Sequence, residues 1–127
     1  TASKIYAPME GKRAVNSIRI YTEDGSMGQI GRVTDPIAEI IKDLDIAVVY
    51  SCGPMAMLSA ITKITDSFSV VHQCAVEEAM ECGIGVCMTC VLPVQNEDGT
   101  ISMVRSCIDG PVMDGSKVQW NSVGKAL

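Results

Sequence analysis

Four cysteines in the second half of the chain constrain its structure more than any other feature. Three of them, Cys82, Cys87 and Cys90, follow the pattern C-x4-C-x2-C, and Cys107 comes after 16 intervening residues. This is the ligand spacing of plant-type [2Fe–2S] clusters, in which four thiolates hold two irons. We therefore expect Cys82, Cys87, Cys90 and Cys107 to be the ligands of a two-iron cluster.

The residues around these cysteines fit the geometry that a cluster needs. Gly83 and Gly85 can adopt positive φ angles, and they carry no Cβ atoms that would collide with inorganic sulfides. Their N–H groups can point at sulfur and so tune the reduction potential. Two predicted strands, Val91–Val94 and Ile101–Ser106, flank a turn at Asn96–Gly99. This hairpin would return the chain to the cluster at the fourth cysteine.

Two other uses of the cysteines stay open. Zinc ribbons pair two C-x2-C knuckles, whereas here only Cys87 and Cys90 have that spacing. Disulfides suit secreted scaffolds, but six cysteines in 127 residues is below the roughly 8–10% of such scaffolds. Outside the four, Cys74 is expected to be a small buried residue. His72 lies in an apolar segment and is expected to be structural rather than a ligand.

The first half of the chain alternates between patterns typical of strands and of helices. The expected order is a strand at Ser17–Tyr21, a glycine-rich loop at Thr22–Gly28, a helix that starts at Thr34–Pro36 and reaches Leu44, a strand at Ile46–Tyr50, a helix from Met55 through Ile64, and a helical segment at Val76–Met80. The apolar run Ile46–Tyr50 is typical of a strand buried on both faces of a parallel sheet. The fold class is therefore α/β, with part of a doubly wound sheet followed by a small cysteine-rich domain that contains a β-hairpin.

Two loops follow predicted strands and are candidates for cofactor binding, because ligands of such sheets bind beyond the carboxyl ends of the strands. They are Asp24-Gly25-Ser26 and Cys52-Gly53-Pro54, although Asp24 has an alternative role as a turn former. No G-x-G-x-x-G phosphate loop fits the sequence, so the first half of a nucleotide-binding domain is expected to be missing. We place the partial α/β domain in residues 1–72 and the cluster domain in residues 73–127.

Composition narrows the classes of partner. Ten Lys and Arg against 15 Asp and Glu give a net charge of −5, which argues against binding to nucleic acid or to an anionic membrane surface. No apolar run approaches the ~20 residues of a membrane span, and no secretory leader is visible, so we expect a cytoplasmic protein. The sequence has one histidine and no convincing nucleophile. We therefore expect electron transfer rather than acid–base catalysis, and no catalytic residues.

Four motifs in order resemble a known family. They are Thr22-Glu23-Asp24-Gly25-Ser26-x-Gly28-x-x-Gly31-x-Val33-Thr34, Cys52-Gly53-Pro54-x-x-Met57-Leu58, Met80-x-Cys82-Gly83-Ile84-Gly85-x-Cys87, and Cys107-x-Asp109-Gly110-Pro111-Val112. Over roughly residues 15–121 the chain resembles the C-terminal half of the electron transfer subunits of dihydroorotate dehydrogenase. These subunits are ferredoxin–NADP reductase-like flavoproteins that act in pyrimidine biosynthesis.

The resemblance implies a fold, cofactors and a partner. Such a subunit has a β-barrel that binds FAD, a Rossmann-like NAD-binding domain and a C-terminal [2Fe–2S] domain. Electrons pass between FMN in a catalytic partner subunit, the cluster, FAD and NAD. The match implies that the four cysteines are the ligands, that Cys52, Gly53 and Pro54 lie by the nicotinamide or flavin, and that Asp24 lies near the nucleotide.

The chain also departs from the family pattern. It contains neither the FAD barrel nor the first half of the NAD domain, so the isolated chain is not expected to oxidise NADH. Its incomplete sheet is expected to promote self-association. Similar small subunits of NADH-dependent ferredoxin–NADP reductases have Asp at the position of Cys82, which favours the dihydroorotate family. The rival hypotheses are that related subunit, a zinc-stabilised interaction module and a stand-alone ferredoxin-like carrier.

Overall fold

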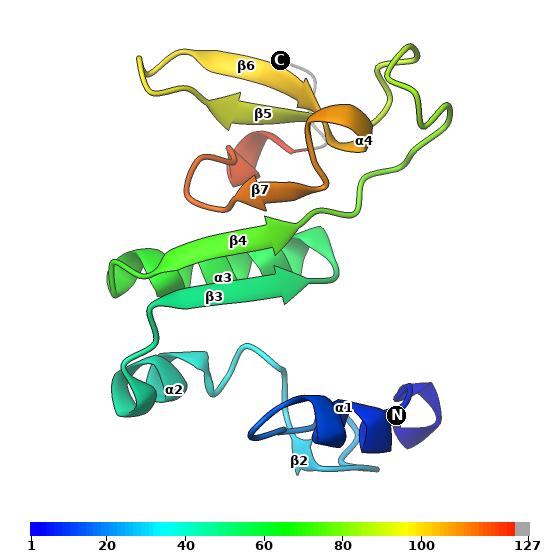
Figure 1. Ribbon diagram of the computed structural model, residues 1–127, viewed down its shortest axis with the longest axis vertical. Helices are drawn as coiled ribbons and strands as arrows, with labels where there is room; N and C mark the ends of the chain where they lie inside the picture. Colours follow the sequence, from blue (N-terminus) through cyan, green and yellow to red (C-terminus); the bar gives the residue numbers. More distant parts are fainter. Residues whose placement is uncertain (124–127) are drawn as a thin grey trace. The chain divides into compact units, whose positions relative to one another are not determined.

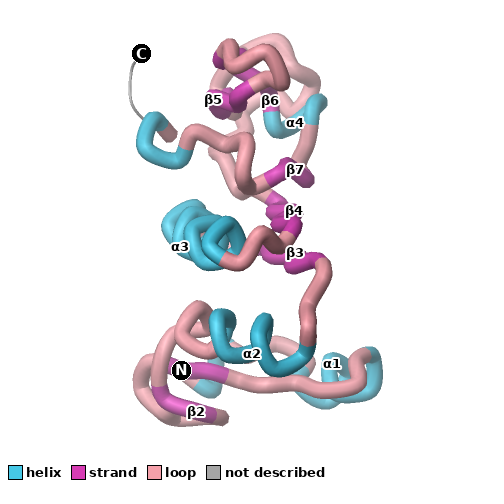
Figure 2. Tube along the Cα trace, turned by 90° about the vertical axis from the view of Figure 1, so that its left-hand side faces the viewer, coloured by secondary structure: helices cyan, strands magenta, loops and turns pink. Residues whose placement is uncertain are grey.

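The computed structural model describes residues 1–123, which divide into two compact units, Thr1–Ile37 and a second unit that begins at Ala38. The first unit contains a 3-10 turn, a short helix and two short strands: η1 (Ala2–Lys4), α1 (Pro8–Ala14), β1 (Tyr21–Thr22) and β2 (Gln29–Ile30). The two strands are parallel, with Tyr21 opposite Gln29. Strand β2 is labelled in Figure 2. Of the residues described in this unit, Thr22 alone is buried, so the apolar core lies elsewhere.

The strand expected at Ser17–Tyr21 is wrong for all but its last residue. Strand pairing begins only at Tyr21, where the backbone meets β2. Before it, the carbonyl oxygen of Ile20 accepts a hydrogen bond of 2.8 Å from Gln29 N. Gly28 has φ +71°, and a Cβ there would overlap the Ile20 carbonyl. Alternation alone predicted a strand, but residues 17–20 have no ladder to join.

The second unit is built on a three-stranded sheet with helix α3 against it (Figure 1). Helix α2 (Ile37–Leu44) begins at the last residue of the first unit and belongs otherwise to the second. The further elements of the second unit are β3 (Val48–Cys52), α3 (Met55–Ser67), β4 (Val71–Ala75), β5 (Val91–Gln95), β6 (Ile101–Arg105), α4 (Ser106–Asp109), β7 (Val112–Asp114) and η2 (Trp120–Ser122). The strand order is β3-β4-β7, with β3 and β4 parallel and β7 antiparallel to β4. The parallel β3–α3–β4 unit agrees with the expected α/β class.

The core of the second unit lies between α3 and the strands. Leu58 of α3, Cys74 of β4 and Leu92 of β5 are fully buried, and Val76 is 5% exposed. Trp120 packs against this cluster, and its Nε1 donates a 2.9 Å hydrogen bond to the carbonyl oxygen of Gly115. The expectation that Cys74 is a buried structural residue is confirmed.

Residues 91–105 form a two-stranded antiparallel pair. Val91 lies opposite Arg105 and Gln95 opposite Ile101. The other edge of β5 contacts the segment 117–119, where Gln95 N donates to Lys117 O and Gln119 N donates to Pro93 O. Both edges of β5 are therefore hydrogen-bonded, which holds the hairpin in register.

Three further expectations differ from the structure. The strand predicted at Ile46–Tyr50 is found at Val48–Cys52, and it is not buried on both faces, since Tyr50 is 72% exposed. In the described residues β3 is an edge strand, and α3 covers one face. Val76–Met80 is not helical, because five residues nucleate a helix poorly and Val76 N is bonded to Pro111 O instead. The expected boundary at residue 72 falls inside β4, and the division of the chain there stays a prediction.

The expected start of the preceding helix is also shifted. The helix begins at Ile37, and Thr34–Pro36 lie in a turn before it. The Asp35 carboxylate accepts a 2.7 Å hydrogen bond from the backbone N–H of Arg32 rather than capping the helix. Pro36 therefore lies in that turn and not in the first turn of the helix.

Candidate metal centre and cofactor-binding loops

The two predicted strands bring the third and fourth cysteines together. Cys90 comes immediately before β5, and Cys107 is the second residue of α4, two positions after the end of β6. Ser106 donates two hydrogen bonds to the carbonyl oxygen of Cys90, from N at 3.0 Å and from Oγ at 3.1 Å. These bonds close the base of the hairpin, so residues 17 positions apart in the chain share one corner of the fold.

The loop between β4 and β5 carries the first two cysteines and depends on glycine for its path. Gly83 and Gly85 have φ angles of +65° and +79°. A Cβ on Gly85 would overlap the side chain of Ile108, whereas the space beside Gly83 is open. Arg105 donates from Nη1 to the carbonyl oxygen of Gly85 at 3.0 Å, which ties the loop to the end of β6.

The four thiols lie in two pairs, Cys82 with Cys87 and Cys90 with Cys107. Hydrogen bonds from the backbone N–H groups of Cys87 and Ile84 lower the pKa of Cys82 to about 6. The N–H and thiol of Cys107 lower the pKa of Cys90. The Cys107 thiol donates a hydrogen bond to Cys90, and this bond, together with burial, raises the pKa of Cys107. Backbone N–H groups directed at sulfur therefore already stabilise thiolate at two positions.

Within residues 1–123 no three His, Cys, Asp or Glu side chains converge on a common point that would hold a metal ion. Hydrogen bonds join the Cys82 thiol to that of Cys87 and the Cys90 thiol to that of Cys107. Four thiols with N–H donors around them are nevertheless the chemistry that an iron–sulfur cluster uses, with two thiolates for each iron. The donor set fits such a cluster.

The loop Cys52-Gly53-Pro54 lies where β3 ends and α3 begins. Gly53 has φ +144°, and a Cβ there would lie 2.8 Å from Met57 Cε. The Cys52 thiol is exposed and donates to the Glu77 carboxylate at 3.7 Å. At the carboxyl ends of the parallel strands a hollow of about 270 Å³ is lined by Tyr50, Ser51, Cys52, Gln73, Ala75 and Val112. This is the position where α/β sheets bind ligands.

The loop Asp24-Gly25-Ser26 belongs to the first unit and forms a tight turn. The Asp24 carboxylate accepts hydrogen bonds from Ser26 N at 3.1 Å and from Ser26 Oγ at 2.6 Å. These bonds lower the pKa of Asp24, and the bond from Ser26 Oγ has the larger effect. Gly25 has φ +66° at the centre of the turn. The turn-forming contact is thus present, and a role in binding a nucleotide stays a prediction.

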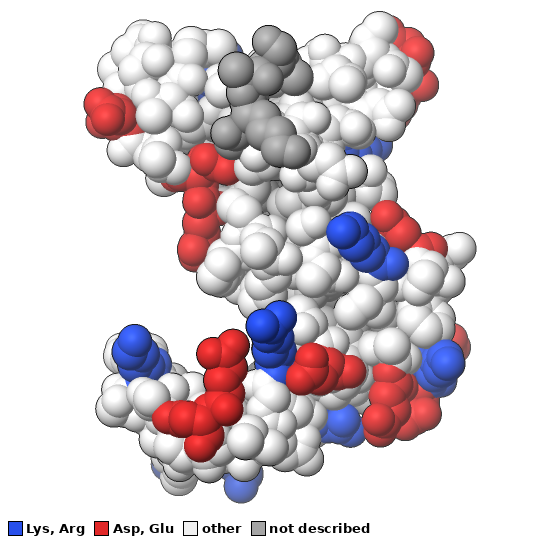
Figure 3. Space-filling view, turned by 180° about the vertical axis from the view of Figure 1, so that it is seen from behind, with Lys and Arg blue, Asp and Glu red and all other residues white. Residues whose placement is uncertain are grey.

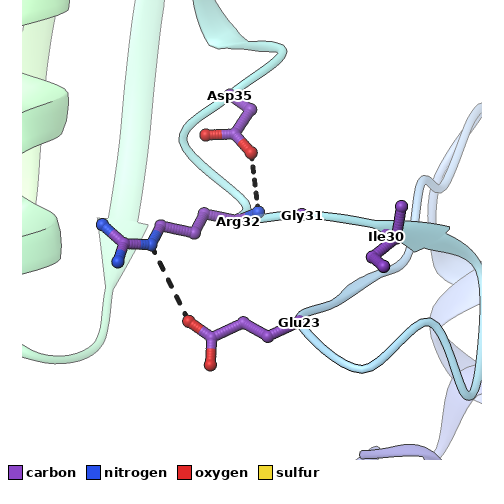
Figure 4. A pocket seen from close by; sticks show the side chains of 5 residues that line it. All are labelled: Glu23, Ile30, Gly31, Arg32 and Asp35. Carbon is purple, nitrogen blue, oxygen red and sulfur yellow. Dashed lines mark hydrogen bonds and ion pairs between the residues drawn. The ribbon is translucent and has the colours of Figure 1, made fainter.

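A larger hollow in the first unit was not predicted as a site from the sequence. It has a volume of about 750 Å³ and is lined by Glu23, Ile30, Gly31, Arg32 and Asp35 (Figure 4). Arg32 Nε lies 3.8 Å from the Glu23 carboxylate, across the hollow from Ile30. The positive φ of Gly31 and the side chain of Asp35 shape the backbone here. The opposite charges of Glu23 and Arg32 are nine residues apart in a loop, and no pattern in the sequence predicts that they meet.

The surface charges are mixed. On the face shown in Figure 3, Lys and Arg side chains stand singly among Asp and Glu side chains. None of the helices described in residues 1–123 is long and apolar enough to cross a membrane.

Comparison with known proteins identifies the cysteine-containing region. Residues 77–119 match the family of iron–sulfur cluster binding domains of dihydroorotate dehydrogenase B. The match includes Cys82, Cys87, Cys90 and Cys107, and it confirms the resemblance stated from the sequence motifs.

The similarity to relatives extends over most of the chain. A dihydroorotate dehydrogenase B (NAD(+)) electron transfer subunit from Caldanaerobacter subterraneus subsp. tengcongensis is 37% identical over 126 residues, which cover 92% of this chain and 50% of that protein. The corresponding subunit from Listeria monocytogenes serotype 4a is 41% identical over 106 residues, or 83% of this chain and 39% of that protein. The chain thus spans half or less of the length of these relatives.

A solved structure gives the same picture of the fold. A chain of the NADH-dependent reduced ferredoxin–NADP oxidoreductase, solved in a study of flavin-based electron bifurcation, superposes with a TM-score of 0.73 and 26% identity. The superposition covers 90% of this chain and 39% of that one. Together with the family match, this likeness supports an α/β fold of the ferredoxin–NADP reductase type.

Proposed function

We propose that the chain holds a [2Fe–2S] cluster through Cys82, Cys87, Cys90 and Cys107 and is part of an electron transfer subunit. The observation that carries this proposal is the family match over residues 77–119, within which the four cysteines have plant-type spacing. Such a cluster, when bound, takes up and releases one electron at a time. The role of this chain is then to hold and insulate the cluster, and it needs no acid or base.

Each part of the cysteine region has a task in this function. The loop with Gly83 and Gly85 presents N–H groups to sulfur, which stabilises negative charge on the thiolates. Arg105 holds the loop through the Gly85 carbonyl. The hairpin presents Cys107 beside Cys90. These contacts hold the loop and the hairpin that carry the four donors.

The whole protein would relay electrons between two flavins. We propose that the partner is a flavin-containing catalytic subunit of the dihydroorotate dehydrogenase type, in pyrimidine biosynthesis, and that FAD and NAD bind to the complete subunit. Cys52-Gly53-Pro54 would lie by the nicotinamide or flavin, and Asp24-Gly25-Ser26 near the nucleotide. Residues 73–127 would be the cluster domain. The clustered cysteines, proposed as cluster ligands, favour a reducing compartment such as the cytoplasm.

Absorption spectroscopy and metal analysis of the anaerobically reconstituted chain test the first step. We expect a reddish-brown protein with about two irons and two sulfides per chain, which bleaches with dithionite. Cys107→Ser should lose most of the iron. Cys52→Ser is the matched control, since Cys52 is exposed and lies outside the four, and it should keep full iron. A colourless protein that binds one zinc and no iron would overturn the proposal.

Partner binding tests the second step separately. The iron-loaded chain, within its full-length subunit, should co-purify with a flavin-containing dihydroorotate dehydrogenase subunit and accept electrons from it. Iron loading without any such transfer would support the cluster but reject the proposed partner.

A further inference from the structure

A series of hydrogen bonds runs through the single, buried histidine and links three elements of the second unit. His72 of β4 is 2% exposed. Its Nε2 lies 2.7 Å from Ser51 Oγ on β3, and its Nδ1 lies 2.9 Å from Thr62 Oγ1 on α3. Ser51 immediately precedes Cys52, so this series of hydrogen bonds ends where the Cys52-Gly53-Pro54 loop leaves the sheet.

The donor and the acceptor in each of these hydrogen bonds follow from counting protons. The Thr62 hydroxyl donates to the carbonyl oxygen of Leu58 at 3.0 Å. A hydroxyl has one proton, so towards His72 the Thr62 oxygen can only accept. Nδ1 must therefore carry the ring proton, and Nε2 accepts the proton of the Ser51 hydroxyl. Every donor in this series then has one acceptor.

We propose that His72, neutral and protonated at Nδ1, is a positioning residue that fixes the carboxyl end of β3 and with it the Cys52-Gly53-Pro54 loop. Ser51 lines the hollow at the ends of the parallel strands together with Cys52. The hydroxyl of Ser51 is oriented by the ring, and the ring is oriented by Thr62 in the middle of α3. The loop is therefore held from the helix it leads into as well as from the strand it leaves. The proposal does not depend on the cluster.

The surroundings of the ring decide in which direction its hydrogen bonds run. Ser51 of β3, Thr62 and Asp66 of α3 and Asp114 of β7 face His72. The two carboxylates favour a charged ring, whereas burial opposes it. A second proton would turn Nε2 into a donor, and the Ser51 hydroxyl would then accept from it instead of donating to it. Acidification should therefore reverse the direction of this hydrogen bond while the contact with Thr62 persists.

Nitrogen NMR of the one histidine tests the assigned proton directly. In the oxidised, iron-loaded chain at neutral pH, long-range proton–nitrogen spectra should show Nδ1 protonated and Nε2 bare. Thr62→Val removes the acceptor for Nδ1–H and should shift both ring nitrogens or change the tautomer. Thr65→Val is the matched control, because Thr65 is equally buried on α3 and bonds only to Ile61 and Thr62 carbonyls. A ring protonated at Nε2, or equal spectra for the two variants, would overturn the proposal.

The reactivity of the exposed Cys52 thiol with 4,4′-dithiodipyridine tests positioning. Loss of one hydrogen bond corresponds to about a fivefold change in the population of an open loop, so Ser51→Ala should speed labelling about fivefold. His72→Gln keeps an acceptor near the Nε2 position and should restore nearly the wild-type rate, whereas His72→Asn should resemble Ser51→Ala. As pH falls from 7.5 to 5.5 the wild-type rate should stay below the Ser51→Ala rate, because the hydrogen bond reverses its direction and does not break. Equal rates for wild type and Ser51→Ala at pH 7.5, with both folded by circular dichroism, would refute positioning.

Discussion

Arg105 and Gly85 are joined by a 3.0 Å hydrogen bond from the guanidinium Nη1 to the backbone carbonyl oxygen. The bond connects the end of β6 to the loop between Cys82 and Cys87. The same Arg105 forms an ion pair with Asp109, four residues further on in α4, at 3.7 Å. One side chain thus contacts both the loop of the first two cysteines and the helix of the fourth.

Replacement of Arg105 should weaken retention of the cluster. Arg105→Gln removes a charge-assisted hydrogen bond from a partly exposed position, a loss of about 1 kcal/mol. We expect iron to be lost to a chelator about fivefold faster than from the wild type. Arg32→Gln is the control, since it removes an exposed arginine from the first unit. Equal rates of iron loss for the two variants would show that the Gly85 contact has no role.

The two glycines of the cysteine loop should differ in their tolerance of alanine. Gly83→Ala meets only the penalty of a positive φ, roughly 1–2 kcal/mol. Gly85→Ala adds an overlap with Ile108, so we expect a total of about 3 kcal/mol. Iron content after reconstitution and the free energy of unfolding measure the difference. The double variant Gly85→Ala/Ile108→Ala should recover part of it, and a failure to do so would contradict the assigned contact.

Stability should fall as pH drops below about 6.5 because of His72. Burial lowers the pKa of His72 from its ordinary value of 6.5, against the opposing effect of Asp66 and Asp114. Between the lowered pKa and 6.5 the unfolded chain binds more protons than the folded chain, so the free energy of unfolding decreases with decreasing pH. Urea titrations from pH 7.5 to 5 measure the slope. His72→Gln should flatten this part of the profile.

Cys74 should be the least reactive of the thiols outside the cluster. Burial raises the pKa of Cys74 to about 11, and its thiol donates to the Met113 carbonyl oxygen at 3.5 Å. At pH 8 its thiolate fraction is on the order of a hundredfold below that of an ordinary thiol. Mass spectrometry after brief alkylation of the iron-loaded chain should find Cys52 modified and Cys74 intact. Modification of both at similar rates would contradict the packing of β4 on α3.

The isolated chain should self-associate through β3. Among the described residues β3 is the outer strand of its sheet, and Tyr50 is 72% exposed on it. Unpaired strand edges pair with other edges unless a charge or a proline blocks them. Sedimentation should show a concentration-dependent dimer, and Tyr50→Lys should shift it towards monomer. A wild-type monomer at the highest concentrations would exclude this association.

Local patterns in the sequence located the elements whose partners are close in the chain. The apolar spacing from Met55 predicted α3, and the two runs around Asn96–Gly99 coincide with β5 and β6 to within a residue at each end. The cysteine spacing pointed to the region that the family model matches. In these cases the periodicity or spacing is itself the physical cause of the structure.

Other features depended on contacts that no pattern encodes. Alternation in Ser17–Tyr21 predicted a strand, but strands need neighbours, and pairing begins only at Tyr21. The helix predicted at Val76–Met80 was wrong because Val76 enters the core and bonds to Pro111. The contact of Arg105 with Gly85 joins residues 20 apart in sequence, and it became visible only in the folded chain.

The hydrogen bonds between Ser106 and Cys90 at the base of the hairpin also show which part of the hairpin holds Cys107 in place and which part can vary in length. The position of Cys107 depends on the base of β5 and β6, where register is set, and not on the tip, where Asn96 and Thr100 close an exposed turn. Residues added to the tip would lengthen the interval between the last two cysteines without moving either sulfur. A search that demands a fixed interval would therefore overlook relatives, whereas one that demands C-x4-C-x2-C followed by a cysteine just beyond the returning strand would find them.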